Sequence, residues 1–211
     1  MSNDFDVQGP SDLGLEAAGF RLENLETDRS IMYMLGPSLR IIYCNKAWDE
    51  FASLNGGIGL ERDVVLGTPI RDVVPDPLRT FYENAFAQVR QQLKPWEHDF
   101  ECSSPDTFRL FHMRVLPLPN LNSIVENSLQ VEKPHGPERP AMSADRTSYV
   151  NENGILAMCC HCRRTRRINA GAVSVWDWVP AFLTDPPGRV SHGLCRTCRA
   201  YYYPDAEIAR R

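Results

Sequence analysis

The sequence predicts an α+β fold, in which an antiparallel sheet with helices on one face is followed by a small cysteine-rich unit. Three observations predict it. Two short strand-like segments come first, helical segments follow, and three more strand-like segments close the first part of the chain. Residues 132–148 then carry three prolines and almost no apolar side chains, as linkers do. Five of the seven cysteines lie beyond that segment.

Charge also divides the chain in two. The 211 residues carry a net charge of -4, but residues 1–154 hold 14 Lys and Arg against 23 Asp and Glu, whereas residues 155–211 hold 9 Arg, no Lys and 4 Asp and Glu. Such an asymmetry predicts two units with different partners. No apolar run approaches the ~20 residues that span a bilayer, and the polar, acidic N-terminus is unlike a secretory signal. We therefore expect no membrane association and a cytoplasmic location.

The first helices and strands follow from periodicity and end signals. Residues 31–45 are typical of two short strands around a Gly-Pro turn. Asn45 can cap the helix that follows, and a Gly-Gly pair at 56–57 can end it. Before these strands, residues 13–26 are expected to form one amphipathic helix, whose apolar face carries Leu15, Ala18, Leu22 and Leu25.

The longest helix has the clearest signals. Asp76 is a good N-cap, Pro77 fits the first helical position, and Pro95 ends the pattern. Residues 65–75 connect it to the preceding helix with at most one short helical turn. A buried stripe at three- and four-residue spacing runs along the helix and consists of Leu78, Phe81, Tyr82, Ala85, Phe86, Val89 and Leu93.

Three strands are expected next, over residues 96–102, 107–118 and 121–131. The first of them alternates strictly, so that one face should be buried and the other should be acidic and exposed. Its buried face carries Trp96, His98, Phe100 and Cys102, and its acidic face carries Glu97, Asp99 and Glu101.

In this order, the elements resemble a PAS domain over residues 28–131. The stretch LRIIYCNKAWDEFA is similar to the family's second strand and Asn-capped helix, and VLGTPIRDVVP is similar to its glycine-containing connector. The long helix and the three closing strands complete the match. The resemblance implies a sensory and dimerisation module, with residues 1–27 as an N-terminal tail and flanking helix that can join two copies.

Residues 149–211 carry two Cys-x-x-Cys pairs. The first is Cys159 with Cys162, and the second is Cys195 with Cys198. Each pair supplies two thiolates from one tight turn, and two pairs complete the tetrahedron that Zn²⁺ prefers. We therefore predict a zinc site that is structural, because four thiolates leave no open position for a catalytic water. A hairpin turning at Asn153-Gly154 should precede it, and a small apolar bundle with a short helix should lie between the pairs.

Three other side chains could take part in this site. Cys160 could chelate together with Cys162, and His161 or His192 could replace a cysteine. We expect instead that His161 is exposed and that His192 makes a supporting hydrogen bond or caps a turn. A thioredoxin-like redox pair needs a βαβ context that the sequence lacks, and a disulfide is disfavoured in a reducing compartment.

The C-terminal unit has its own resemblance. CCHCRRTRR and VSHGLCRTCRAYYYP are similar to a segment attached to some bacterial PAS-containing signalling proteins, which implies a bacterial signalling role. The arginines around the two pairs predict either a basic surface for nucleic acid or an acidic partner protein, or a solvated face that neutralises the zinc–thiolate centre. They are Arg163, Arg164, Arg166, Arg167, Arg196 and Arg199.

The PAS resemblance also implies that a ligand could bind inside the first module. Haem-binding members place a ligating His on the long helix, and residues 78–94 contain none; the Asn-Cys-Arg-Phe motif of flavin-photoadduct members is absent too. Haem and flavin are therefore not supported, and the small molecule stays unknown. His98 and Cys102 lie ~13 Å apart on one strand, too far to share an ion. The candidate pocket residues are His98, Cys102, Asn127, Phe111 and Met113.

The sequence offers no phosphate-binding glycine loop, kinase phospho-acceptor box, HExxH or GxSxG motif. We therefore expect a non-enzymatic signalling protein, in which a PAS-like module senses or dimerises and a basic zinc-binding tail contacts a partner. The expected partner is a second copy or another signalling protein. One alternative is a nucleic-acid-binding regulator that acts through the arginine-rich tail. A second alternative is a thiol-redox switch.

Overall fold

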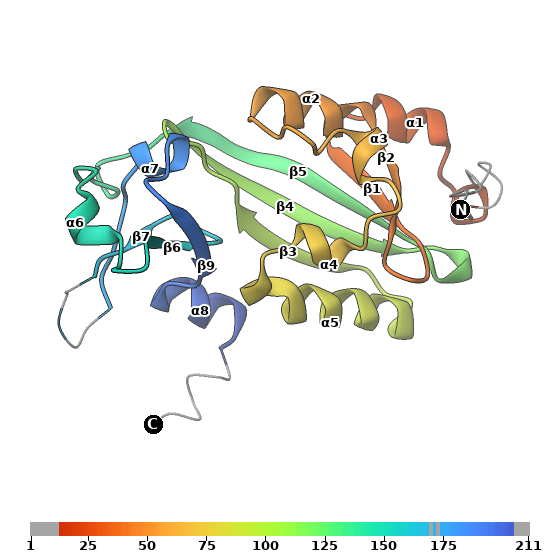
Figure 1. Cartoon of the computed structure of the whole chain (residues 1–211). Coiled ribbons are helices and arrows are strands. Elements are labelled where there is room, and N and C mark those ends of the chain that lie inside the picture. Colours follow the sequence, from red (N-terminus) through yellow and green to blue (C-terminus); the bar gives the residue numbers. More distant parts are fainter. Residues whose placement is uncertain (1–12, 169–170, 172–173, 205–211) are drawn as a thin grey trace, which may run out of the picture. The chain divides into compact units, whose positions relative to one another are not determined.

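The computed structural model describes residues 13–168, 171 and 174–204 (Figure 1). The chain forms two compact units, each built from three segments. Unit 1 contains the chain up to Val74 together with Glu83–Asp99 and His112–Leu129. Unit 2 contains Pro75–Tyr82, Phe100–Phe111 and the chain from Gln130 onward. The predicted boundaries at residues 27, 131 and 148 stay predictions.

The main sheet has the predicted α+β character. Its five strands lie in the order β2-β1-β5-β4-β3, and β1 pairs antiparallel with both β2 and β5 (Figure 1). The helices α2 to α5 fall between the second and third strands of this sheet, as predicted. The strands are β1 (Ile31–Leu35), β2 (Ile41–Cys44), β3 (Trp96–Glu101), β4 (Thr107–Pro117) and β5 (Ser123–Pro134).

Both strongly signalled helices form. Helix α2 (Lys46–Leu54) is capped by Asn45, whose side-chain oxygen accepts from the Trp48 N–H at 3.2 Å. Helix α5 (Asp76–Gln92) buries most of its predicted stripe. Phe81 is half-buried, and Leu93 is 67% exposed, because it follows the last helical residue with a φ of 51°. The connector contains one short helix, α4 (Ile70–Val73), as predicted, and a further short helix, α3 (Arg62–Val65), directly precedes it.

The prediction of a single amphipathic helix over residues 13–26 is wrong. The structure has a 3-10 turn at Glu16–Ala18, a break at Gly19 with a φ of 80°, and then α1 (Leu22–Thr27). The left-handed conformation at Gly19 redirects the chain, so that the predicted apolar face does not continue. The leucines still find a core, which consists of Leu13, Leu15, Leu25, Met32, Met34, Leu118 and Ile124.

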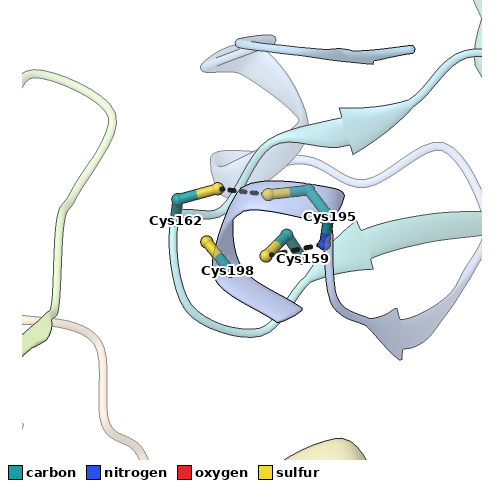
Figure 2. A group of neighbouring side chains, drawn as sticks. All are labelled: Cys159, Cys162, Cys195 and Cys198. Atoms are coloured by element: carbon teal, nitrogen blue, oxygen red, sulfur yellow. Dashed lines mark hydrogen bonds between the residues drawn. The ribbon is translucent and has the colours of Figure 1, made fainter. Parts of the chain in front are cut away.

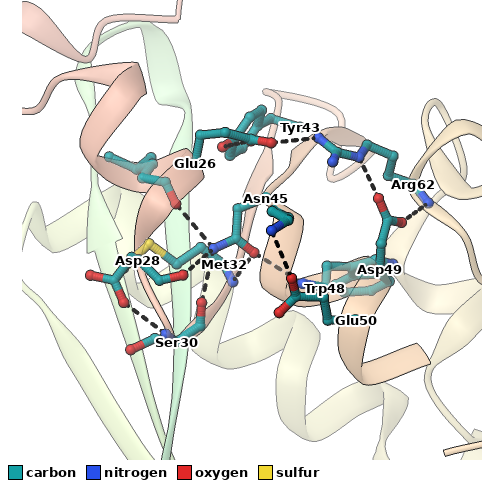
Figure 3. Close-up of polar contacts among 12 residues, drawn as sticks. Glu26, Asp28, Ser30, Met32, Tyr43, Asn45, Trp48, Asp49, Glu50 and Arg62 are labelled. Atoms are coloured by element: carbon teal, nitrogen blue, oxygen red, sulfur yellow. Dashed lines mark hydrogen bonds and ion pairs between the residues drawn. The ribbon is translucent and has the colours of Figure 1, made fainter. Parts of the chain in front are cut away.

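Asn45 ties the first elements of unit 1 together (Figure 3). Its side-chain amide donates to the carbonyl oxygens of Leu25 at 3.0 Å and Ser30 at 2.9 Å. Its side-chain oxygen accepts from the N–H groups of Met32 and Trp48 at 3.0 and 3.2 Å. The side chain is fully buried, and one residue thus joins α1, β1 and α2.

Unit 2 contains a small mixed sheet in the order β8-β7-β6-β9. The predicted apolar bundle is therefore wrong, although the predicted short helix is present as α7 (Ala181–Thr184). The predicted turn at Asn153-Gly154 is present, with a φ of 69° at Gly154, and Val150 and Leu156 form an antiparallel bridge around it. The arm before the turn is limited to this single bridge, because α6 (Arg146–Tyr149) ends directly before Val150, and β6 pairs along its length with β9 and at one position with β7. The strands are β6 (Ile155–Cys159), β7 (Thr165–Arg166), β8 (Trp176–Asp177) and β9 (Arg189–Gly193).

The core of this small sheet is apolar and includes the short helix. Tyr149, Leu156, Met158, Val179 and Phe182 form one buried cluster. Among the helices of the described residues, none is long and apolar enough to cross a membrane.

Candidate metal centre

Four cysteines of unit 2 meet at one point (Figure 2). The sulfur atoms of Cys159, Cys162, Cys195 and Cys198 all lie within 4.8 Å of one another, and all four residues are buried. The Cys162 and Cys195 sulfurs are 3.8 Å apart. A tetrahedron with Zn–S bonds of ~2.3 Å has edges of about 3.8 Å. The spacing and the all-sulfur donor set therefore fit one Zn²⁺ ion.

Parallel pairing of two strands brings the cysteine pairs together. In the β6–β9 ladder, Cys159 stands opposite Gly193, so the chain leaves both strands at the same end of the sheet. After β6, the Arg163 N–H donates to the Cys159 carbonyl at 3.0 Å, which closes the first turn. After β9, Cys195 stands at the N-cap position of α8 (Arg196–Tyr202), whose first turn carries Cys198.

The four thiols of the cluster influence one another's protonation. The pKa of the Cys159 thiol lies below its ordinary value, because its sulfur accepts hydrogen bonds from the thiols of Cys162, Cys195 and Cys198. The same bonds to Cys159 raise the pKa of Cys162 and of Cys198. Further thiolates would repel the first one in a buried site. All four protons can leave together only when a cation occupies the centre.

The three alternative ligands lie outside this cluster. Cys160 is buried, and desolvation, helped by the charge of Cys159, raises the pKa of its thiol to about 12. It therefore stays a thiol at neutral pH, which disfavours metal binding and oxidation. The ring of His161 is half-buried rather than exposed, and its Nδ1 lies 2.8 Å from the Tyr202 hydroxyl. His192 is exposed on β9, opposite Met158.

The six arginines are not one uniform surface. Arg167 forms an ion pair with Asp177, with 2.8 Å between Nε and the carboxylate. Three of the six are exposed, namely Arg166, Arg196 and Arg199, whereas Arg163, Arg164 and Arg167 are half-buried.

The candidate pocket residues of unit 1 are in part engaged with their neighbours. The His98 ring is half-buried and stacks on Trp96, with 5.4 Å between ring centroids. Asn127 is buried, and its amide donates to the Ile31 carbonyl at 3.3 Å. Met113 is buried. Their role in binding a ligand stays a prediction.

The candidate pocket residues of unit 2 are Cys102 and Phe111. Cys102 is half-buried, and desolvation raises the pKa of its thiol despite the nearby charges of Arg163 and Arg109. Phe111 is buried and stacks on Phe100, with 5.5 Å between ring centroids.

A buried ion pair in unit 2 escaped the sequence analysis. Both guanidinium NH groups of Arg139 donate to the Glu101 carboxylate, at 2.6 and 2.9 Å, and the two side chains are 10% and 8% exposed. The Arg139 guanidinium also lies 4.8 Å from the ring centroid of Trp178. Strand alternation predicted Glu101 on an exposed acidic face, and no local signal pairs it with an arginine in a proline-rich segment.

Tyr202, the last residue of α8, and Tyr203, which follows it, make a second set of contacts that the sequence did not indicate. The Tyr203 hydroxyl donates to the Pro77 carbonyl at 2.7 Å. The ring of Tyr202 packs edge-on against Phe81, with 4.9 Å between centroids. Because Tyr202 also contacts His161, a continuous set of contacts runs from the first cysteine turn to the start of α5.

Comparisons with known proteins give only distant structural likenesses. No protein-family model and no curated protein matches the sequence. Among solved structures, a domain of an HTR-like protein from Haloarcula marismortui is 12% identical, with a TM-score of 0.38 over 49% of this chain and 100% of that one. A PAS domain from a two-component sensor histidine kinase is 17% identical, with a TM-score of 0.36 over 57% of this chain and 99% of that one.

A third solved structure, the phage VqmA–DPO complex, is 13% identical, with a TM-score of 0.41 over 57% of this chain and 54% of that one.

Proposed function

We propose that this chain is a non-enzymatic signalling protein, in which a PAS-like module is joined to a basic, zinc-stabilised unit that contacts a partner. Two features support the proposal. The order of strands and helices in the sheet agrees with the resemblance read from LRIIYCNKAWDEFA and VLGTPIRDVVP. Four buried cysteine sulfurs form a closed site, whose chemistry suits fold stabilisation rather than catalysis.

The observation that carries the proposal is which segments make up unit 2. This unit contains the four-cysteine cluster together with the first turns of α5, at Pro75–Tyr82, and the end of β3, the turn after it and the start of β4, at Phe100–Phe111. Two sets of contacts hold these segments. Tyr203 donates a hydrogen bond to Pro77 and Tyr202 packs against Phe81. Glu101 and Arg139 form the buried ion pair. A change in the metal centre would therefore act on elements that continue into unit 1.

Zinc is the proposed ion because the donor set is four thiolates in a tetrahedral spacing. In so small a sheet, metal binding would supply much of the folding free energy. The partner would contact the exposed arginines of this unit, namely Arg166, Arg196 and Arg199, which suit an acidic protein surface.

Hydrogen exchange with and without a chelator tests the proposal on the full chain. We expect chelation to raise amide exchange in β6 and β9 and also in residues 76–82 and 100–111, whereas β1 should change little. Native mass spectrometry should find one zinc per chain, lost in Cys162→Ser and kept in the matched control Cys102→Ser. Faster exchange confined to β6 and β9 would contradict the proposal, because the metal centre would then have no effect on the segments that continue into unit 1.

A ligand in the first module is proposed from the resemblance and from the half-buried ring of His98 and the buried amide of Asn127. The same spectra test it. A small molecule that leaves with the native protein and is lost in His98→Ala would support a sensory role. Spectra that show the bare polypeptide and zinc under gentle conditions would count against it.

A further inference from the structure

The segment that joins α2 to α3 exposes an unusual run of apolar side chains. Ile58 is 94% exposed and Leu54 is 83% exposed. Val64, Leu60 and Leu66 follow at 59%, 44% and 42%. Single exposed apolar side chains are ordinary, but these five within thirteen residues together expose roughly a few hundred Å² of apolar area, the amount found in contiguous patches that mark interaction sites. We call residues 54–66 the α2–α3 surface.

The segment behind this surface is held in place rather than left loose. The indole N–H of Trp48 donates to the Leu60 carbonyl at 2.6 Å. The backbone N–H of Arg62 donates to Asp49 at 2.8 Å, and the Arg62 guanidinium bridges Asp49 and Glu26, at 2.5 and 2.9 Å (Figure 3). Burial opposes ionisation of Asp49, but the hydrogen bonds from Arg62 outweigh it and hold the pKa of that carboxyl below its ordinary value.

This fixed geometry has a consequence for binding. A preformed surface loses little conformational entropy when a partner covers it, and the exposed apolar side chains lose contact with water. In the free chain, the exposure of Leu54 and Ile58 to water is unfavourable in free energy, and an interface that covers them would remove this unfavourable term.

We infer that the α2–α3 surface is where two copies of this chain associate, each contributing the same face. The sequence LNGGIGL, residues 54–60, contains no charged side chain, so two copies can meet there without like-charge repulsion. Charged residues flank this uncharged stretch in the sequence, with Lys46 and Glu50 before it and Glu61, Arg62 and Asp63 between it and Val64. Residues 54–60 are therefore the centre of the inferred interface, because interface centres are depleted in charged side chains.

The size of the surface also suits a pair of copies. A standard interface buries about 800 Å² on each partner, and a few hundred Å² of apolar area supplies its centre. This inference goes beyond the proposed function, because that function names no second copy and no residue of the metal centre takes part in the α2–α3 surface.

Sedimentation velocity of the full zinc-loaded chain between about 1 and 100 µM tests the inference. We expect a reversible dimer, and Ile58→Asp should raise its dissociation constant about 100-fold, because a two-fold contact would bury two unpaired carboxylates. The matched control is Leu93→Asp, which adds the same charge at a different exposed apolar residue of unit 1 and should leave the dimer intact.

Three results would overturn the inference: a wild-type chain that stays monomeric at 100 µM, an Ile58→Asp dimer of unchanged affinity, or equal weakening by Leu93→Asp. Because Ile58 is almost fully exposed, the variant should keep the wild-type circular dichroism spectrum. Zinc content measured on the same samples separates this result from the proposed function. A monomer with one zinc per chain would refute only the dimer surface.

Discussion

Breaking the Arg139–Glu101 pair should destabilise unit 2 far more than an ordinary charge substitution. Both side chains are nearly buried, and the pair is bidentate, at 2.6 and 2.9 Å. Burial alone would lower the pKa of Arg139, but the hydrogen bonds to Glu101 and its charge raise that pKa above the ordinary value. In Arg139→Met, the Glu101 carboxylate keeps its hydrogen bond from the Ser103 hydroxyl but loses its counter-charge.

The expected loss in the free energy of unfolding is ~3–5 kcal/mol for Arg139→Met, the cost of leaving one buried charge unpaired. Replacing both partners, as in Glu101→Leu with Arg139→Met, should cost much less than the sum of the single losses, because no unpaired charge remains. Arg166→Met is the matched control on an exposed arginine and should change stability by no more than ~0.5 kcal/mol.

Urea unfolding of the zinc-loaded chain, followed by tryptophan fluorescence, measures these changes, because Trp178 lies beside Arg139. A zinc indicator in the same titration reports whether metal is released in the same transition. The reasoning is refuted if Arg139→Met loses less than ~1 kcal/mol, or if the two single losses simply add in the double variant.

Further predictions concern thiols, alkaline pH and the cap of α2. Burial raises the pKa of Cys44 and Cys160 to about 12 each, so iodoacetamide at neutral pH should label the half-buried Cys102 first in zinc-loaded protein; peptide mapping that finds Cys160 labelled first would contradict this. Burial likewise raises the pKa of Tyr82 to about 12, so its contribution to stability is complete below pH 10 and is lost as the pH rises from 10 towards 12, because Tyr82 ionises there only in the unfolded chain. Thermal unfolding across that range measures the loss, and Tyr82→Phe should make it smaller without abolishing it, because burial also raises the pKa of Tyr43, Tyr149, Tyr202 and Tyr203. Asn45→Ala should cost ~3 kcal/mol or more in urea unfolding, because several buried backbone groups lose their partner, and a loss below ~1 kcal/mol would show that water replaces the amide.

Local signals were sufficient where structure depends on neighbours in sequence. Asn45 caps α2 and the apolar stripe of α5 is buried, because capping and helical periodicity act within a few residues. The prediction of one N-terminal helix was wrong for a local reason as well, because Gly19 adopts a left-handed conformation that ends the helical pattern. Periodicity alone does not report that a glycine will take this conformation.

The prediction of an apolar bundle in the C-terminal unit was wrong for a different reason. Strands β7 and β8 contain two residues each, too short for any alternating pattern, and the β6–β9 pairing joins segments more than thirty residues apart. The sheet that contains them depends on contacts between distant segments, namely the two cysteine turns and the apolar cluster around Leu156 and Val179. No sequence window contains both halves of that arrangement.

The sequence by itself determined the four-cysteine donor set, since two-residue spacing within each pair fixes a thiolate turn whatever lies between the pairs. It also determined the α+β character of the first part of the chain. Only the tertiary structure decided which other segments lie in the same unit as the four-cysteine cluster. The pairing of Arg139 with Glu101, the docking of Tyr203 on Pro77 and the exposure of Ile58 all depend on which surfaces remain after the chain has packed, and that is a property of the whole fold.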